Sequence, residues 1–255
     1  MTGVVLEISG GVALLTLDNA AKLNALTVPM LEALEAHLIA IEQDTEVRVV
    51  IVTGAGEKAF CCGADIAAWG KLSPAEFARH WVRDGHRVFD RLARLSKPTI
   101  AAVNGHAFGG GLELATACDI RVMTPRATLA LPEARVGIVP GWSGTQRLMR
   151  LIPEPVVKEM ALFGRRIGAE RAVALGYAAS VAEDALGKAR EIATEINALS
   201  PRATEVAKAM IHAAVDEDRG AMVEALGAAA IGASEDRIEG VAAFLEKRPA
   251  TFTGR

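Results

Sequence analysis

Two glutamates stand in apolar surroundings beside residues that turn the chain. Glu113 directly follows Leu112 and the glycine run 109–111, and Glu133 follows the segment Leu129-Ala130-Leu131-Pro132. A carboxylate in an apolar setting is costly unless it is used or paired. Two carboxylates on either side of one water would hold different pKa values, so that one acts as a base and the other as an acid near neutral pH. The alternative is that each glutamate is an exposed helix or loop charge.

The glycines at 109–111 allow a sharp turn and a close approach of a ligand to the main chain. A short helix is predicted to follow at once, so its free N–H groups and its dipole face whatever binds there. That geometry suits an oxygen that becomes negative during a reaction. A second glycine loop, residues 59–66, also follows a predicted strand, and two converging loops would form a two-donor oxyanion hole. A tight strand-to-helix connection without a ligand is the other interpretation.

The elements that position these loops alternate along the first 140 residues. Apolar runs at 4–8 and 12–17, split by Gly10-Gly11, predict a strand hairpin. Further β-branched or apolar runs and helix-start signals predict these elements: strands over 47–53, 99–103 and 120–123, and helices from Thr27, from Ser73 to about Leu95 and over 112–118. Alternation of this kind indicates βαβ units. From about residue 143 the chain is alanine-rich and helical, with Ser200-Pro201 as another helix start. The fold class is therefore α/β with a helical C-terminal part.

Composition excludes several classes of protein. With 255 residues, 51% of them hydrophobic, the chain can bury a large core. A net charge of −3 argues against a nucleic-acid-binding protein, which usually carries a basic excess. No apolar run is long enough to span a membrane, and the N-terminus lacks a secretory signal, so a cytoplasmic location is expected. Three cysteines fit a reducing compartment, and no spacing of Cys or His indicates a metal site.

Five segments in order resemble the enoyl-CoA hydratase/isomerase, or crotonase, superfamily. Residues 101–114, AAVNGHAFGGGLEL, look like its signature. Four further segments agree in order: KLNAL at 22–26, AFCCGADI at 59–66, LPE with GIVPG at 131–141, and GTQRL at 144–148. The C-terminal FLEKR at 244–248 also resembles the family. The resemblance spans essentially the whole chain. It implies a crotonase-type spiral of ββα units over 1–195, which holds the CoA and catalytic site. It also implies a helical oligomerisation region over 196–255 that packs a homotrimer or a homohexamer.

The same resemblance implies roles for individual residues. The backbone N–H groups of Ala64 and Gly110 would hold the thioester oxygen of a trans-2-enoyl-CoA. Glu113 would help to remove a proton from water as its oxygen attacks C3, and protonated Glu133 would deliver a proton to C2. The substrate would be an acyl-CoA thioester, with no separate cofactor and no metal, since coenzyme A is part of the substrate. Its expected contacts are Lys22, Asn24, Ala25, Leu26, Cys62, Ala64, Asp65, Ile66, Gly109, Pro132, Gly141, Trp142 and Lys247.

Three residues depart from the familiar hydratase pattern. His106 stands where many hydratases carry tyrosine, and its simplest interpretation is a packed loop residue. Trp142 and Ser143 stand where short-chain hydratases carry smaller residues. Trp142 is close to Glu133 in sequence, so it either reshapes the acyl pocket or packs in the core.

The predicted function is an enoyl-CoA hydratase, a hydro-lyase of acyl-CoA metabolism. Within the superfamily the alternatives are an enoyl-CoA isomerase and an enzyme that forms, breaks or hydrolyses carbon–carbon bonds of an acyl-CoA. A non-catalytic scaffold or RNA-binding member is a further alternative, against which the two intact glutamates argue. Outside the superfamily, the alternatives are a dinucleotide-binding enzyme and a serine hydrolase. The loop from Gly54 to Ala59 nearly matches the dinucleotide-binding pattern GxGxxG/A, and the segment Gly141-Trp142-Ser143-Gly144-Thr145 partly resembles a serine nucleophile elbow.

Overall fold

A computed structural model describes residues 2–217 and 219–255 of the chain. Two compact units are present, residues 1–201 and residues 202–255. The first holds both sheets and most of the helices, and the second is entirely helical where it has regular structure. The expectation that residues 196–255 serve oligomerisation stays a prediction. Within the described residues, none of the helices combines the length and apolarity that crossing a bilayer requires.

The larger sheet of the first unit has six strands and is mostly parallel. Its order is β1-β2-β3-β5-β7-β10, with β1 and β2 antiparallel and the other neighbours parallel. The bounds are β1 Gly3–Ser9, β2 Val12–Asp18, β3 Val49–Gly54, β5 Thr99–Val103, β7 Ile120–Met123 and β10 Ser180–Val181. The hairpin and the three buried strands predicted from the sequence are therefore confirmed. The two-residue β10 was not predicted, because a strand so short has no pattern to read.

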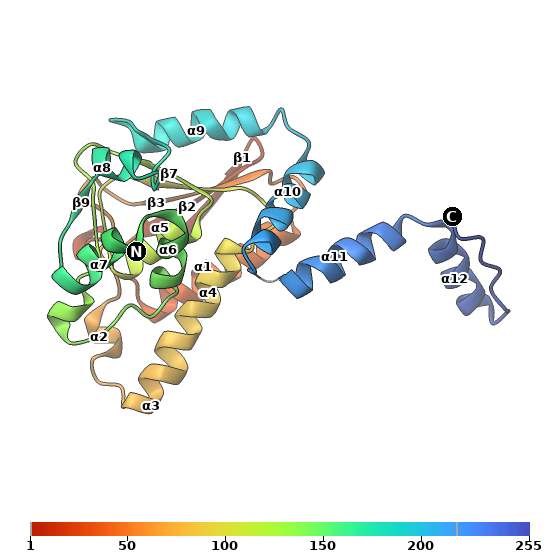
Figure 1. Cartoon of the computed structure of the whole chain (residues 1–255), viewed down its shortest axis with the longest axis horizontal. Helices are drawn as coiled ribbons and strands as arrows, with labels where there is room; N and C mark the ends of the chain where they lie inside the picture. The colour runs from red at the N-terminus through yellow and green to blue at the C-terminus, as the bar shows by residue number, and fades with distance from the viewer. Residues whose placement is uncertain (1, 218) are drawn as a thin grey trace. The chain divides into compact units, whose positions relative to one another are not determined.

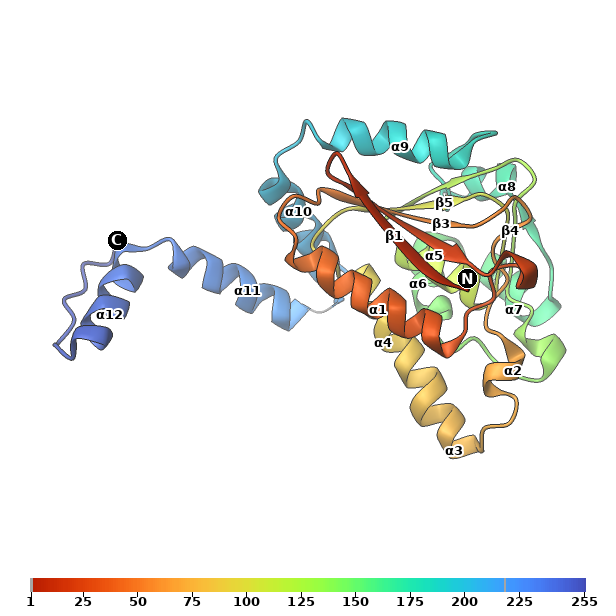
Figure 2. The same ribbon diagram turned by 180° about the vertical axis from the view of Figure 1, so that it is seen from behind.

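Both faces of this sheet are covered, as Figures 1 and 2 show. In β3, Val49 and Ile51 pack in a cluster with α9 (Ala185–Ile196), whereas Val50 and Val52 belong to the main core on the other face. That main core includes residues of α1 (Val28–Gln43), α4 (Arg83–Ala93) and α5 (Gly110–Ala117). A strand buried on both faces reads as a continuous apolar run, which is why β3 was recognisable.

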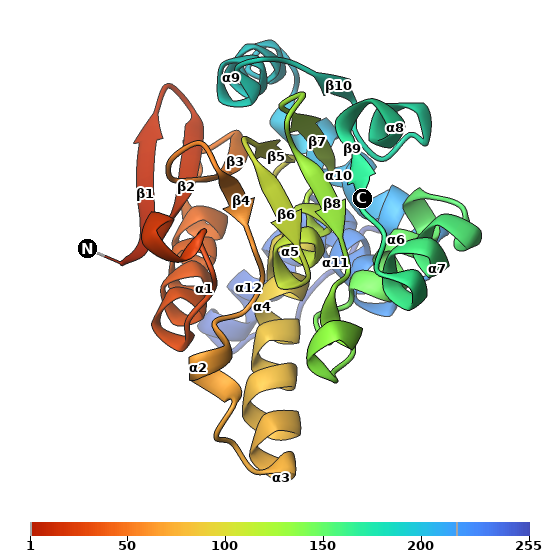
Figure 3. The same ribbon diagram turned by 90° about the vertical axis from the view of Figure 1, so that its left-hand side faces the viewer.

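A second, four-stranded sheet was missed by the sequence analysis (Figure 3). Its order is β4-β6-β8-β9, with β4, β6 and β8 parallel and β9 antiparallel to β8. The bounds are β4 Ala59–Cys61, β6 His106–Phe108, β8 Thr128–Ala130 and β9 Ile167–Gly168. Strands of two or three residues are too short for an alternating pattern to identify them.

The predicted helices are present, with one unpredicted feature. The segment from Ser73 begins with a capping box at α3 (Pro74–Glu76) and continues as η2 (Phe77–Val82) before α4. The η2 stretch is a π-helix, a form that often lies at functional sites. The remaining helices are η1 Ala20–Lys22, α2 Ile66–Trp69, η3 Glu133–Val136, α6 Gly144–Leu151, α7 Glu154–Phe163, α8 Ala169–Ala174, α10 Pro201–Ala214, α11 Arg219–Gly232 and α12 Glu235–Glu246.

Candidate active site

Three parallel strands of the small sheet end at one cavity. The chain leaves β4 into Cys62 and Gly63, leaves β6 into Gly109 and Gly110, and leaves β8 toward Glu133. All of these residues line a cavity of about 280 Å³. Loops at the carboxyl ends of neighbouring parallel strands meet at the same edge of a sheet, which is where open α/β sheets commonly bind ligands. The sheet that the sequence analysis missed is thus the one that assembles the site.

The two glycine loops converge, as the oxyanion-hole hypothesis requires. A Cβ built on Gly63 would lie 3.2 Å from the carbonyl oxygen of Phe108 and 3.5 Å from the amide nitrogen of Gly110. Gly63 has a φ of +100°, a backbone conformation that glycine adopts readily. The loops pack main chain against main chain because neither glycine carries a side chain.

Among the residues that the structure describes, the backbone N–H groups of Ala64 and Gly110 have no backbone partner, so they can face a ligand. Leu26 and Ala64 form a parallel β-bridge, in which the Leu26 N–H donates to the carbonyl of Gly63 and the Asp65 N–H donates to the carbonyl of Leu26. The N–H group of Ala64 therefore points away from Leu26. Gly110 is the first residue of α5, where N–H groups have no partner within the helix. Both residues line the cavity. The pair has the composition of an oxyanion hole: two main-chain donors, one of them at a helix N-terminus.

Glu113 lies one turn into α5 and is only 3% exposed. Its Oε1 accepts hydrogen bonds from the backbone N–H groups of Trp142 and Gly144, each at 2.9 Å. Burial raises the pKa of this carboxyl, while the two N–H donors and the positive charge of Arg147 act to lower its pKa. One oxygen is thereby fixed by the main chain, which leaves Oε2 as the atom that can contact a substrate.

Glu133 begins η3 and is 8% exposed. Burial, with a smaller contribution from the negative charge of Glu113, raises the pKa of its carboxyl to about 7, against the lowering effect of a hydrogen bond from its own backbone. Glu113 and Glu133 line the same cavity. Among the described residues, the buried Oε2 of Glu133 has no hydrogen-bond partner. A buried polar atom of this kind is costly unless something binds to it, so Glu133 is suited to hold a proton and to pass it to a ligand.

The rest of the cavity is apolar. Its remaining walls come from α2, η2 and the segment after Glu133: Ile66, Trp69, Phe77, Trp81, Val82, Val136, Ile138, Val139 and Trp142, together with Arg135. An apolar cavity with a few converging polar groups is the usual form of a small-molecule site. It can bury a hydrocarbon group next to the two carboxyls and the two amides.

Ten of the predicted site residues line this cavity. They are Cys62, Ala64, Ile66, Gly109, Gly110, Glu113, Pro132, Glu133, Gly141 and Trp142. Glu113 and Glu133 are 20 positions apart in the sequence, and the loop of Ala64 is further away still. Only the tertiary structure brings them together.

The other predicted contacts lie outside the cavity. Lys22 forms an ion pair with Asp65 at 2.7 Å, close to the loop that carries Ala64. The buried side chain of Asn24 accepts from the Asn19 N–H and donates to the carbonyls of Ala55 and Ala59. Its contacts are therefore structural, and they hold the loop before β4.

Three more predicted contacts complete this group. Leu26 is fully buried and pairs with Ala64 through its backbone, and Ala25 precedes it half-buried. Lys247 belongs to the second unit, where it ends α12 in the left-handed conformation.

The roles of Gly144 and of the aromatic wall were not predicted from the sequence. Gly144 is the first residue of α6, and a helix N-terminus with free N–H groups was the signal that could have identified it as a donor to Glu113. The wall residues Trp69, Phe77 and Trp81 lie on helices far from the glutamates in sequence. Nothing in their spacing distinguishes them from core residues. His106, noted above as a departure, stacks on Phe108 and pairs with the Thr128 hydroxyl, as a packed residue does.

Two rival motifs have other structural roles. The glycine loop after β3 leads into β4 rather than opening a helix, so it lacks the context of a dinucleotide-binding loop. Ser143 has a φ of +70°, and its hydroxyl lies 2.8 Å from Nδ1 of His86, which itself faces Asp90. This resembles part of a serine hydrolase triad. However, Ser143 does not line the cavity, and its two neighbours, Trp142 and Gly144, are the residues that hold Glu113.

Comparisons with known proteins agree with this geometry. The family model described as Enoyl-CoA hydratase/isomerase matches residues 7–255. The chain is 38% identical to the short-chain-enoyl-CoA hydratase of Clostridium acetobutylicum, over 97% of this chain and 96% of that protein. It is 36% identical to the crotonyl-CoA hydratase of Syntrophomonas wolfei, over 99% and 98%. The crystal structure of an enoyl-CoA hydratase from Bacillus anthracis superposes with a TM-score of 0.81 at 36% identity, covering 99% of each chain. The chain belongs to the enoyl-CoA hydratase/isomerase family.

Proposed function

We propose that this protein is an enoyl-CoA hydratase, which adds water across the C2=C3 bond of a trans-2-enoyl-CoA to give a 3-hydroxyacyl-CoA. The observation that carries the proposal is the pair of buried carboxyls, Glu113 and Glu133, in one cavity with two free main-chain amides. Relatives named for hydration of short enoyl-CoA and crotonyl-CoA, similar over nearly the whole chain, support it.

The amides of Ala64 and Gly110 bind the thioester oxygen in this proposal. Attack at C3 moves electrons through C2 toward that oxygen, which gains enolate character. Two N–H donors stabilise the developing charge, and the loss of one such donor typically costs about 3–4 kcal/mol in an enzyme of this type. The oxygen also lies at the N-terminus of α5, where the helix dipole favours negative charge.

The two glutamates divide the proton transfers. Glu113 acts as the base in its ionised form: burial raises the pKa of its carboxyl, two backbone N–H groups and Arg147 oppose that rise, and its Oε2 accepts a proton from water. The water oxygen bonds to C3 as the C2=C3 π pair moves toward C2. With a pKa of about 7, Glu133 holds a proton in a substantial fraction of molecules near neutral pH, and in that form it gives the proton to C2. Water thus supplies the hydroxyl. After the product leaves, the proton on Glu113 passes to Glu133 through solvent, which returns both carboxyls to their starting protonation states.

The remaining contacts complete the proposal. The apolar wall buries the acyl group, and the pantetheine and adenosine parts pass along the loops of Asn24-Ala25-Leu26 and Ala64-Asp65-Ile66. Lys22 contacts a CoA phosphate in this proposal, and the contact of Lys247 with a CoA phosphate stays a prediction. No cofactor is needed beyond the coenzyme A of the substrate. We also propose a homotrimer or a homohexamer in the cytoplasm.

The test is hydration of crotonyl-CoA, followed by the loss of ultraviolet absorbance from the conjugated thioester. Glu113→Gln and Glu133→Gln each keep size and shape but cannot transfer the proton, so each should lower kcat by about 10²–10⁴. Glu170→Gln, at an exposed position of α8, is the matched control and should keep full activity. Near wild-type hydration by either active-site variant would show that the two-carboxyl mechanism is wrong.

The same assay separates hydration from the main alternative. An isomerase would leave 2-enoyl-CoA unchanged and would convert 3-enoyl-CoA into its conjugated isomer, with a gain of absorbance. That result would replace the proposal of a hydratase while keeping the family.

A further inference from the structure

We propose that Trp142 limits this enzyme to small acyl groups, by closing the inner end of the cavity with its indole ring. This inference rests on the proposed hydratase function and deepens it, because it names the class of acyl group that fits. Trp142 is 3% exposed, and it lines the cavity together with Glu113, Glu133 and Gly110.

The indole lies against the group that would bind the thioester oxygen. A Cβ built on Gly110 would be 2.7 Å from the ring carbon Cζ3 of Trp142. Because Gly110 supplies one of the two oxyanion donors, the ring borders the space next to the thioester carbonyl. The acyl chain begins at that carbonyl, so its first carbons run alongside this ring.

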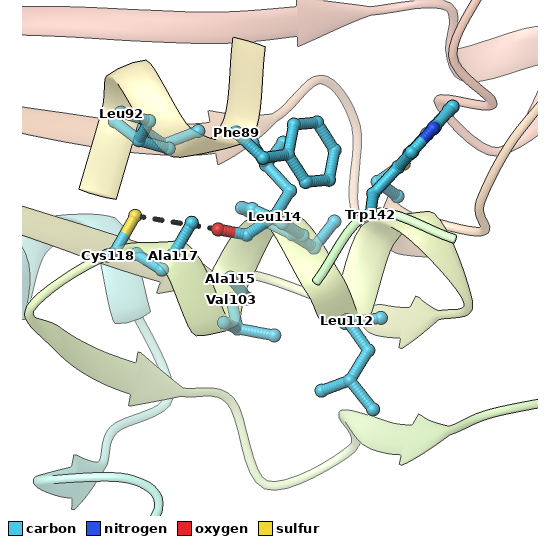
Figure 4. Close-up of a cluster of buried hydrophobic side chains, with 14 of the residues drawn as sticks. Phe89, Leu92, Val103, Leu112, Leu114, Ala115, Ala117, Cys118 and Trp142 are labelled. Carbon is cyan, nitrogen blue, oxygen red and sulfur yellow. Dashed lines mark hydrogen bonds between the residues drawn. The ribbon is translucent and has the colours of Figure 1, made fainter. Parts of the chain in front are cut away.

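The ring is held rigidly from behind. Its Nε1 donates to the carbonyl of Trp81 at 3.2 Å, and the ring contacts Trp81 and Phe89 with centroid separations of 5.3 and 5.0 Å. Figure 4 shows Trp142 within this buried cluster, near Phe89. A ring locked by a hydrogen bond and two aromatic neighbours cannot swing aside for a longer chain without disturbing the core.

Gly85 is the position in α4 that makes room for the indole. A Cβ on Gly85 would lie 2.2 Å from Nε1 of Trp142, which no packed structure tolerates. Glycine is unfavourable inside a helix, so its presence in α4 is explained by the ring that occupies the space of its side chain. The pair of Gly85 and Trp142 thus fills volume between α4 and the oxyanion loop that would otherwise extend the cavity.

Removal of the ring should therefore lengthen the acyl site. The space vacated lies between Gly110 and Gly85, and Trp81 and Phe89 would form its new apolar floor. Each methylene group that gains or loses a place in an apolar pocket changes kcat/KM by about tenfold or more. A chain several carbons longer than crotonyl should respond strongly.

The experiment compares kcat/KM for crotonyl-CoA and trans-2-decenoyl-CoA in the wild type, Trp142→Phe and Trp142→Ala. The wild type should favour crotonyl-CoA by at least about tenfold. Trp142→Ala should shift the ratio toward decenoyl-CoA by at least about tenfold, with Trp142→Phe in between. The ratio cancels any common loss of rate, including one caused by movement of Glu113. If Trp142→Ala does not fold, the direction of the Trp142→Phe shift still tests the inference.

Leu92→Ala is the matched control, because Leu92 is fully buried on α4 but does not line the cavity. It loosens the same core and should leave the ratio unchanged. An unchanged ratio in both Trp142 variants, an equal shift in Leu92→Ala, or a wild type that prefers decenoyl-CoA would overturn the inference. Calorimetric binding of butyryl-CoA and decanoyl-CoA gives a second readout. If the wild type hydrated neither thioester, the proposed function would fail, whereas the binding preference would still decide whether Trp142 limits acyl size.

Discussion

Replacement of Glu133 by glutamine should stabilise the protein at alkaline pH. Burial raises the pKa of this carboxyl from its usual 4.5 to about 7, whereas in the unfolded chain the pKa stays near the usual value. The unfolded state therefore gives up its proton first as pH rises, and the folded state loses stability between pH 4.5 and 7. At about 1.4 kcal/mol for each pKa unit, the wild type loses about 3 kcal/mol across this window.

Glutamine has nearly the same shape and does not ionise, so Glu133→Gln escapes this loss. Its free energy of unfolding relative to wild type should increase by about 2–3 kcal/mol between about pH 5 and pH 8.5. Urea denaturation followed by tryptophan fluorescence measures this difference. Protein concentration should be the same throughout, because association shifts apparent stability.

Glu170→Gln is again the control, because it removes an exposed carboxylate of α8 rather than a buried one. A difference between Glu133→Gln and wild type that stayed constant across this range would refute the argument that burial holds the proton on Glu133. The same conclusion would follow if the wild type became relatively more stable as the pH rose. In either case the assignment of Glu133 as the proton donor would lose its electrostatic basis.

Two further variants test how the site is held. In Gly144→Ala the new Cβ would lie 2.4 Å from Cγ of Glu113 and displace its carboxylate, so kcat should fall about 10²-fold. Gly168→Ala is the control: its new Cβ would meet nothing within 4 Å, so this variant should keep full crotonyl-CoA hydration. Equal rates for the two variants would contradict the placement of Glu113. Asn24→Ala should lower the free energy of unfolding by about 2–3 kcal/mol, because it leaves two carbonyls and one N–H of the loop without their partner. A change below about 0.5 kcal/mol on urea denaturation would show that this loop is held by other contacts.

The candidate site was only partly predictable from the sequence. Carboxylates in apolar sequence drew attention to Glu113 and Glu133, and glycine runs to the two loops, but their roles followed from the resemblance to the family. The aromatic wall and Gly144 escaped, because their residue types are ordinary for a core and for a helix start. The relevance of Trp142 to the acyl pocket was foreseen only as one of two alternatives. Its contact with Gly85 was invisible, since 57 positions separate the two in the sequence.

The sequence by itself determined the large sheet, the main helices and the pair of acidic residues, because continuous apolar runs, capping residues and embedded charges are local signals. Only the tertiary structure decided that four short strands pair into a second sheet and that three of them deliver their loops to one cavity. Strands of three residues have no periodicity of their own and form because distant segments supply their hydrogen-bond partners. The setting of the two carboxyls, one held by two amides and the other raised to a pKa of about 7 by burial, likewise exists only after those loops have met.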